Sequence, residues 1–101
     1  MLEKDIVNQI MKYLKTLPYC FCWKEHGGMY GVAGLPDIIC CLSGRFIAFE
    51  VKQPSGKLTK LQEVTITKIR KANGEAHKVT SVEEVIQILS RLEGLPLWIN
   101  K

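Results

Sequence analysis

The sequence has 101 residues, a formal net charge of +4 at pH 7, 47% hydrophobic residues and 24% charged residues. These values predict one folded domain over residues 1–101, and they exclude a disordered chain and a chain with two cores. The apolar runs are too short to span a bilayer, and the modest positive charge permits contact with a phosphate backbone.

The start of the chain and its cysteines indicate a protein of the cytoplasm. The initial methionine is soon followed by three charged residues, which does not fit a secretory signal peptide. Cys20 and Cys22 are two residues apart and Cys40 and Cys41 are adjacent, so neither pair has the spacing of a zinc site. All four lie in apolar runs, and we expect core thiols rather than metal ligands or disulfides. We therefore expect a cytoplasmic protein with no membrane partner.

A helix is predicted from Leu2 to Leu17. Its apolar residues recur at helical spacing, and Pro18 ends it. Glu3 falls on the apolar side of this helix, where a carboxylate requires an explanation. One explanation is favourable placement in the first turn, near the positive end of the helix dipole. The other is that Glu3 faces inward, toward a functional site.

Residues 19–25 are predicted to form a strand, because aromatic residues alternate there with cysteine and lysine. Tyr19, Phe21 and Trp23 share one face of this strand. We expect these aromatic side chains to pack in the core rather than to form a platform on which nucleic-acid bases stack.

A glycine-rich loop follows over residues 26–34, without the glycine order of a nucleotide-binding fingerprint. Such a loop can close over a phosphate backbone, with Lys24, His26 and Tyr30 near the phosphates. The alternative for His26 is an ordinary loop histidine without a binding role.

The centre of the sequence contains two apolar runs, Ile38 to Leu42 and Phe46 to Val51, whose lengths suit strands. Ser43 and Gly44 lie between them and suit a hairpin with a two-residue loop. Alternatively, Gly44 is the left-handed residue of a three-residue loop with a bulge, which would shift the pairing of the strands.

The two-residue loop places Asp37 directly opposite Glu50, at the open end of the hairpin. Facing Cβ atoms on antiparallel strands lie roughly 4.5–5.5 Å apart, so the two carboxylates repel each other unless a cation lies between them. Proteins hold Mg²⁺ through one or two carboxylates together with waters and phosphate oxygens. Lys52 lies on the same face as Glu50, because strand side chains alternate, and its ammonium can orient a metal-bound water. The sequence therefore predicts a divalent-cation site at this pair.

A second helix is predicted over residues 59–72, opened by a T-x-x-Q capping box that ends at Gln62 and closed at Asn73. Its expected buried residues are Leu61, Thr65, Ile69 and Ala72. Lys57 and Lys60 belong to a basic region at its start. This region is either a solvated face or a rim that follows DNA phosphates.

The last part of the chain predicts a strand over residues 76–80 and a helix from 81 to about 92, opened by a second capping box, Ser81 to Glu84. The apolar tail over residues 95–99 packs on the core or forms part of a subunit interface. The helix before the fourth strand is a crossover that returns this strand parallel to a neighbour. Both faces of the central strand are apolar, so helices should cover both sides of an α/β sandwich with a central mixed sheet.

Pro36-Asp37, followed by Glu50-Val51-Lys52, resembles the PD-(D/E)xK nuclease motif. The sequence Gly34 to Asp37, the residues after it and the small size resemble more narrowly the VRR-NUC group of that superfamily, over nearly the whole chain. The resemblance implies a restriction-endonuclease-like α-β-β-β-α-β-α fold and a nuclease that requires Mg²⁺ or Mn²⁺.

The resemblance also implies roles for single residues and partners. The implied metal ligands are Asp37, Glu50, the Val51 carbonyl and Glu3. Lys52 would position the attacking water, and Gln62 would point at the site in addition to its role as a cap. Stand-alone proteins similar to this chain act as homodimers on branched DNA, including four-way junctions.

Two other functions stay open from the sequence. One is a nucleic-acid-binding or protein-interaction module that has the fold without the chemistry, and the intact set of Asp37, Glu50 and Lys52 argues against it. The other is a sequence-specific restriction-type nuclease, which ranks lower because the sequence contains no added recognition domain.

Overall fold

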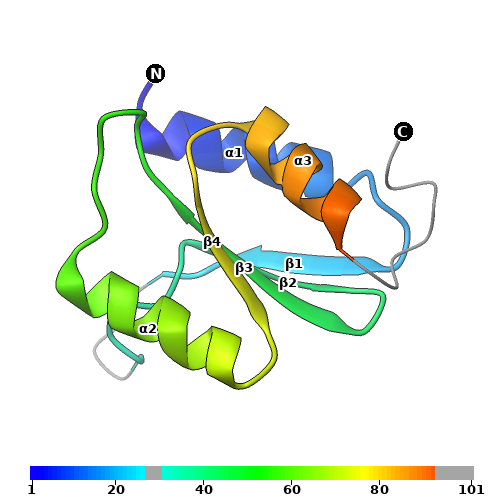
Figure 1. Cartoon of the computed structure of the whole chain (residues 1–101). Helices are drawn as coiled ribbons and strands as arrows, with labels where there is room; N and C mark the ends of the chain where they lie inside the picture. The colour runs from blue at the N-terminus through cyan, green and yellow to red at the C-terminus, as the bar shows by residue number, and fades with distance from the viewer. Residues whose placement is uncertain (27–30, 93–101) are drawn as a thin grey trace.

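The computed structural model describes residues 1–26 and 31–92. The chain runs through α1 (Glu3–Leu14), β1 (Cys20–Lys24), β2 (Ile38–Leu42), β3 (Arg45–Val51), α2 (Lys60–Lys71), β4 (Glu75–Val79) and α3 (Val82–Arg91) (Figure 1). This is the order of elements that the sequence predicts. Within the described ranges, no helix is long and apolar enough to cross a membrane. Tyr30 and the apolar tail, for which the sequence predicts roles, lie outside the described residues.

The four strands form one mixed sheet in the order β1-β2-β3-β4. β1 and β2 are antiparallel, as are β2 and β3, and the crossover through α2 brings β4 parallel to β3. At the hairpin, Leu42 faces Arg45. Ser43 (φ 51°) and Gly44 (φ 84°) both have the left-handed backbone that a tight two-residue hairpin turn requires. The predicted two-residue loop is therefore confirmed, and the three-residue alternative is wrong.

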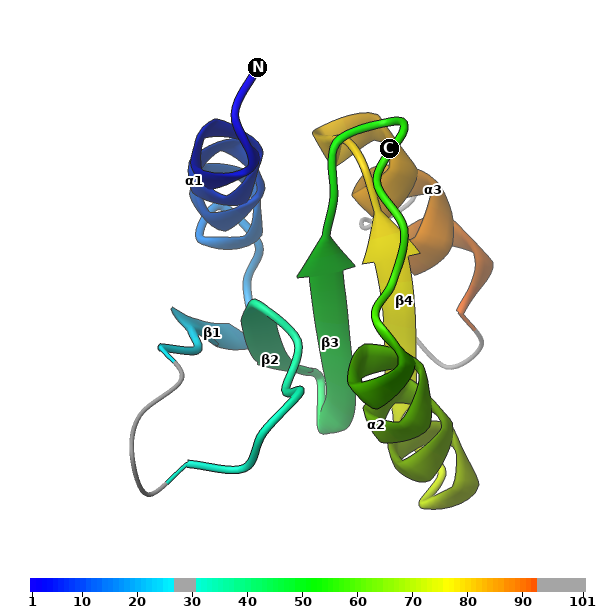
Figure 2. The ribbon, with the colours of Figure 1, turned by 90° about the vertical axis from the view of Figure 1, so that its left-hand side faces the viewer.

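Helices cover both faces of the sheet, as predicted, but unequally (Figures 1 and 2). α1 and α3 lie together on one side, which we call the two-helix face, and α2 lies on the other, which we call the one-helix face. The core on the two-helix face is the larger, and its fully buried members include Ile10, Leu14, Ile47, Phe49, Val85 and Leu89. A smaller cluster under α2 contains Ile39, Ala48, Ile66 and Ala76.

α1 is shorter than predicted, because it ends at Leu14 and not at Leu17. A residue that precedes a proline avoids the helical conformation, so the chain leaves the helix before it reaches Pro18. The predicted apolar side of the helix is confirmed, since Ile6 and Ile10 are buried.

The expectation that Tyr19, Phe21 and Trp23 pack in the core is wrong, because all three side chains are exposed. β1 is an edge strand, while α2 packs on β4 at the opposite edge of the sheet (Figure 2). The part of the one-helix face near β1 is therefore left without the cover that strand aromatics usually have.

The cysteines divide between the same two faces. All four are free thiols. Cys40 is buried in the core of the two-helix face, and Cys20 and Cys22 pack against that core, as expected. Cys41 points to the one-helix face and is exposed, so its predicted place in the core is wrong.

Both predicted helix starts are present, with one difference. Thr59 Oγ1 accepts from the Gln62 N–H at 3.2 Å and Gln62 Oε1 accepts from the Thr59 N–H at 2.9 Å, which completes the first capping box. Ser81 Oγ accepts from the Glu84 N–H at 3.2 Å, but the Glu84 carboxylate accepts from Thr80. The second box is therefore only half formed.

α2 buries a narrower stripe than predicted. Thr65 is buried as expected, together with Ile66, whereas Leu61 and Ala72 are exposed. The helix covers β3 and β4 and reaches β2 only at Ile39, so residues at the flanks of its predicted apolar stripe stay in contact with solvent.

Candidate functional site

Asp37 and Glu50 lie at the same end of the sheet, as predicted. Asp37 comes directly before β2, and the β2–β3 register, continued one step past its last pair, places it opposite Glu50. The Val51 N–H donates to Asp37 Oδ2 at 2.8 Å, and the Glu25 N–H donates to the Asp37 carbonyl oxygen at 2.8 Å. These two bonds fix the aspartate between β1 and β3.

Glu50 is a buried carboxylate with only 3% of its surface exposed. Burial is the largest cause that raises the pKa of Glu50 to about 8, followed by a hydrogen bond with Asp37 and the charge of Asp37. The positive charge of Lys52 lowers this pKa, and the negative charge of Glu3 raises it. At neutral pH the Asp37–Glu50 pair therefore retains a proton, unless a cation takes its place.

Lys52 and Glu3 reach this pair from two elements. Lys52 follows β3, is half-buried, and is held by its N–H, which donates to the Val79 carbonyl oxygen at 3.0 Å. Glu3 is the first residue of α1, and it lines the same cleft as Asp37. Glu3 is exposed in the first turn of α1, as the first explanation expects, and its charge also acts on Glu50, while a role toward a metal stays a prediction.

A cleft of about 430 Å³ opens beside Asp37, between the first half of α1 and the end of β1. The residues that line it are Glu3, Lys4, Val7, Asn8, Lys24, Glu25, His26 and Asp37. Lys24 Nζ donates to Asn8 Oδ1 at 2.9 Å, which holds the ammonium at the wall of the cleft. Asn8 and Glu25 carry no sequence signal for this site, because their position depends on how α1 packs on β1.

The other residues for which the sequence predicts a role lie elsewhere. Lys57 and Lys60 are exposed on the connection before α2 and on its first turn, and neither lines the cleft. Gln62 uses its amide oxygen in the capping box, so that its predicted role as a cap is confirmed. This leaves only the amide nitrogen of Gln62 for any role at the site.

The chemistry of the carboxylate pair fits a hard divalent cation. In the described part of the chain, no group of three His, Cys, Asp or Glu side chains is arranged to hold a metal ion. Mg²⁺ does not need three such ligands, since it takes one or two carboxylates and keeps several waters. The buried Glu50 and the half-buried Asp37 supply two carboxylates that share a hydrogen bond, where a cation can replace the proton.

Two solved structures have the same fold. One, described as "VRR_NUC domain", superposes with a TM-score of 0.75 and 21% identity, over 88% of this chain and 95% of that chain. The other, described as "VRR_NUC domain protein", gives a TM-score of 0.73 and 19% identity, over 94% of this chain and 90% of that chain. The sequence matches no protein-family model and no curated protein. The chain therefore has the fold of a VRR_NUC domain, the restriction-endonuclease-like α/β architecture that the resemblance of its sequence implies.

Proposed function

We propose that the protein is a metal-dependent DNA endonuclease that hydrolyses phosphodiester bonds and selects branched DNA. The observation that carries this proposal is the pair of the buried Glu50 and the half-buried Asp37, beside a cleft with lysines in its wall. A module that only binds gains nothing from a buried carboxylate that faces a second one, because their mutual repulsion destabilises the fold. The VRR_NUC fold supports a nuclease-type domain.

The residues at the site divide the chemical work. Asp37 and Glu50 would hold Mg²⁺ or Mn²⁺, with Glu3 as a further carboxylate from α1. The Val51 N–H points to Asp37, and the carbonyl of a strand residue points to the same side as its N–H, which suits Val51 as a ligand. The bound ion would polarise the scissile phosphate and lower the pKa of a water. Lys52 orients the attacking water and stabilises the negative charge that develops on the phosphate.

Contacts to the DNA backbone come from basic residues around the cleft and along α2. Lys24 and His26 serve the phosphates near the cut, and Lys57 and Lys60 serve phosphates further along the DNA strand. Affinity should therefore fall steeply as the salt concentration rises. A double variant with Lys57→Ala and Lys60→Ala should show a flatter salt dependence, and an unchanged slope would place the DNA on another surface.

We also propose that the protein acts inside the cell as a homodimer. The domain measures 36 × 32 × 22 Å, which is small for a grip on a four-way junction. A two-fold dimer would present two equivalent sites to two strands. Sedimentation equilibrium should give about twice the mass of the 11.5 kDa chain. A single-chain mass with intact junction cleavage would contradict this assembly.

The decisive experiment is cleavage of labelled DNA by the purified chain and its site variants. Substrates should include a junction, a flap, a duplex and a single strand, with Mg²⁺ or Mn²⁺ present. Asp37→Asn removes the charge of a metal ligand and keeps its shape, so cleavage should collapse while DNA binding survives. Lys52→Ala should also abolish cleavage but leave metal affinity almost unchanged, because an ammonium is not a ligand.

The control is Glu83→Gln, which removes one exposed carboxylate from the first turn of α3. It changes the net charge by the same amount as Asp37→Asn and should leave cleavage at the wild-type rate. Wild-type cleavage by Asp37→Asn would end the assignment of a nuclease site here. If the wild type bound DNA but did not cleave it, the alternative function would be favoured, a nucleic-acid-binding module that has the fold without the chemistry.

A further inference from the structure

The uncovered part of the one-helix face carries three exposed rings. Phe21 on β1 is 71% exposed, Trp23 on β1 is 40% exposed, and Phe46 on β3 is 44% exposed. The sheet register places Phe21, Cys41 and Phe46 in one row across three strands, with Cys41 also exposed. The rings of Phe21 and Trp23 lie 5.6 Å apart between centroids. A sheet surface with several exposed rings close together is a candidate contact surface for another molecule.

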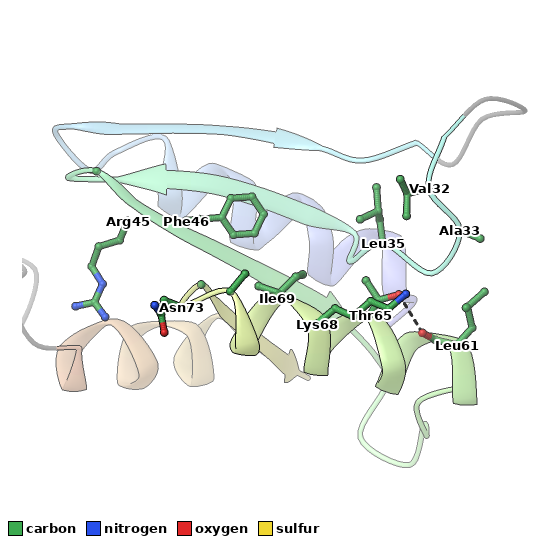
Figure 3. A pocket seen from close by; sticks show the side chains of 13 residues that line it. Val32, Ala33, Leu35, Arg45, Phe46, Leu61, Thr65, Lys68, Ile69 and Asn73 are labelled. Carbon is green, nitrogen blue, oxygen red and sulfur yellow. Dashed lines mark hydrogen bonds between the residues drawn. The ribbon is translucent and has the colours of Figure 1, made fainter.

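A groove of about 700 Å³ runs beside this row, between α2 and the strands. In Figure 3, Phe46 points into the groove from β3, opposite Ile69 and Lys68 of α2. One end of the groove is at Leu35, two residues before Asp37, and the other end is at Gly44 in the hairpin turn. The groove therefore runs along the length of α2, and one of its ends is at the segment that leads into Asp37.

The charge along the groove is positive on the side of α2. Lys68 lines the groove and also a second hollow on the outer side of the helix. Lys60 and Lys71 line that hollow as well, and Glu63 is the single acidic residue among those described there. Apolar rings on one side and lysines on the other match the two parts of a nucleotide, the flat base and the charged phosphate.

The ring surface is also connected to the candidate active site. Trp23 Nε1 donates to Glu25 Oε2 at 3.1 Å, which fixes the orientation of the indole. The N–H of Glu25 in turn donates to the carbonyl oxygen of Asp37, and Glu25 lines the cleft. A DNA strand that leaves the cleft at Glu25 therefore meets the ring of Trp23 next.

We propose that this surface binds an unpaired DNA strand, whose bases stack on Phe21, Trp23 and Phe46 while its phosphates face Lys68. This inference rests on the proposed nuclease function and adds the part of the substrate that the sheet recognises. The bases of a duplex are stacked on one another, whereas an unpaired strand offers their faces. Neighbouring strands of a sheet lie about 4.8 Å apart, so Phe21 and Phe46 are separated by roughly 10 Å and hold different bases.

The test measures binding of a fluorescein-labelled oligodeoxythymidine by anisotropy, in EDTA, so that no cleavage occurs. Phe21→Leu and Phe46→Leu keep the apolar area and remove the ring. Each should weaken single-strand binding by about 5-fold to about 150-fold, the equivalent of one stacked base. Phe21→Tyr and Phe46→Tyr keep the ring and should bind as the wild type does. Binding of a blunt duplex should change less than about twofold in all four variants.

Gln87→Ala is the control, because Gln87 is exposed on α3, which lies on the opposite face of the sheet (Figure 2). It should leave both affinities unchanged. Single-strand affinity that is equal in Phe21→Leu and the wild type overturns the proposal, and so does an equal loss for duplex and single strand. If Phe21→Leu lowers the mass in solution and leaves single-strand affinity unchanged, the face belongs to a second copy of the chain.

A second readout uses Trp23 itself, in a Trp98→Phe background that leaves it as the only tryptophan. Stacking should quench its fluorescence on addition of the oligonucleotide, and absence of quenching at saturation contradicts the proposal. Both measurements are made without metal, so they separate this inference from the nuclease function. If the wild type cleaves DNA but Phe21→Leu does not change single-strand affinity, the stacking surface is rejected and the proposed nuclease site is not affected.

Discussion

Phe49 and Phe46 lie three residues apart on β3 and point to opposite faces of the sheet. Phe49 is fully buried in the core beneath α1 and α3, whereas much of Phe46 is open to solvent beside α2. The same strand therefore presents one ring to a complete core and the other to a half-covered surface. The difference indicates that the two-helix face supplies most of the stability and leaves the one-helix face available for contacts with other molecules.

Glu50 sharpens this contrast, because it shares the one-helix side of β3 with Phe46 and is nevertheless buried. The segment before Asp37 closes this end of the face by packing on α2. At Gly34, a Cβ atom would lie 2.7 Å from Leu61 Cγ and 2.9 Å from Thr65 Oγ1. One face thus holds both exposed rings and a buried carboxylate, and the carboxylate is costly to bury unless a proton or a cation neutralises it.

The two phenylalanines give the largest expected difference in stability. Phe49→Ala should lower the free energy of unfolding by about 3–5 kcal/mol, because it leaves a cavity in the core. Phe46→Ala should lower it by about 1 kcal/mol or less, since its ring already contacts solvent. Urea denaturation of both variants beside the wild type measures the two values. Similar losses would mean that the one-helix face is covered in solution.

The hairpin shows how much of the fold short-range sequence rules determine. Ser43 and Gly44 fix the loop length, and the loop length fixes the register, so the prediction that Asp37 faces Glu50 follows from local chemistry alone. Capping at Thr59 is predictable for the same reason. These rules act within a few residues and do not depend on how the elements pack.

The aromatic residues show where such reasoning ends. Alternation correctly places Phe21 and Trp23 on one side of β1, but it does not state whether a helix covers that side. The coverage depends on where the crossover places α2, and this is a property of the whole fold. The contact between Lys24 and Asn8, which joins β1 to α1, is unpredictable for the same reason.

The second prediction concerns the buried carboxylate. In the folded chain the pKa of Glu50 is raised to about 8 from its ordinary value of 4.5. Between these values the folded protein binds a proton that the unfolded chain does not, so stability should fall as pH rises through this range. Thermal melts of the wild type without metal should show this fall. Glu50→Gln stays neutral, so it should flatten the profile and, above about pH 8, exceed the wild type in stability by roughly a few kcal/mol at most.

Magnesium extends the same measurement. Above the pKa of Glu50 the ionised pair is free to bind a cation, so Mg²⁺ should raise the melting temperature of the wild type most at high pH. The melting temperature of Glu50→Gln should rise less on addition of Mg²⁺. If the stability of the wild type depended on pH in the same way as that of Glu50→Gln, the burial of the Glu50 carboxylate would cost no free energy of folding. The contrast between a buried Glu50 and an exposed Phe46 on one face would then be contradicted.

The smallest effect distinguishes two glycines that both have left-handed backbone, Gly34 (φ 78°) and Gly44 (φ 84°). Alanine at either position costs about 1–2 kcal/mol of backbone strain. At Gly44 the new methyl group meets nothing within 4 Å, so Gly44→Ala should cost only this amount. At Gly34 it meets Leu61 and Thr65, so Gly34→Ala should cost more, by about 1 kcal/mol.

The backbone strain at the two glycines is nearly the same. The extra loss of stability in Gly34→Ala, compared with Gly44→Ala, therefore measures how tightly the segment before Asp37 packs on α2. Gly34→Ala pushes that segment away from Leu61 and displaces the chain three residues before Asp37, so cleavage should fall together with stability. Gly44→Ala lies at the far end of β2 and should leave cleavage unchanged at a temperature where both variants are folded. Urea denaturation and the cleavage assay give the two quantities. Equal costs of unfolding would mean that the segment rests only loosely on α2, and the burial of Glu50 would then depend on other contacts.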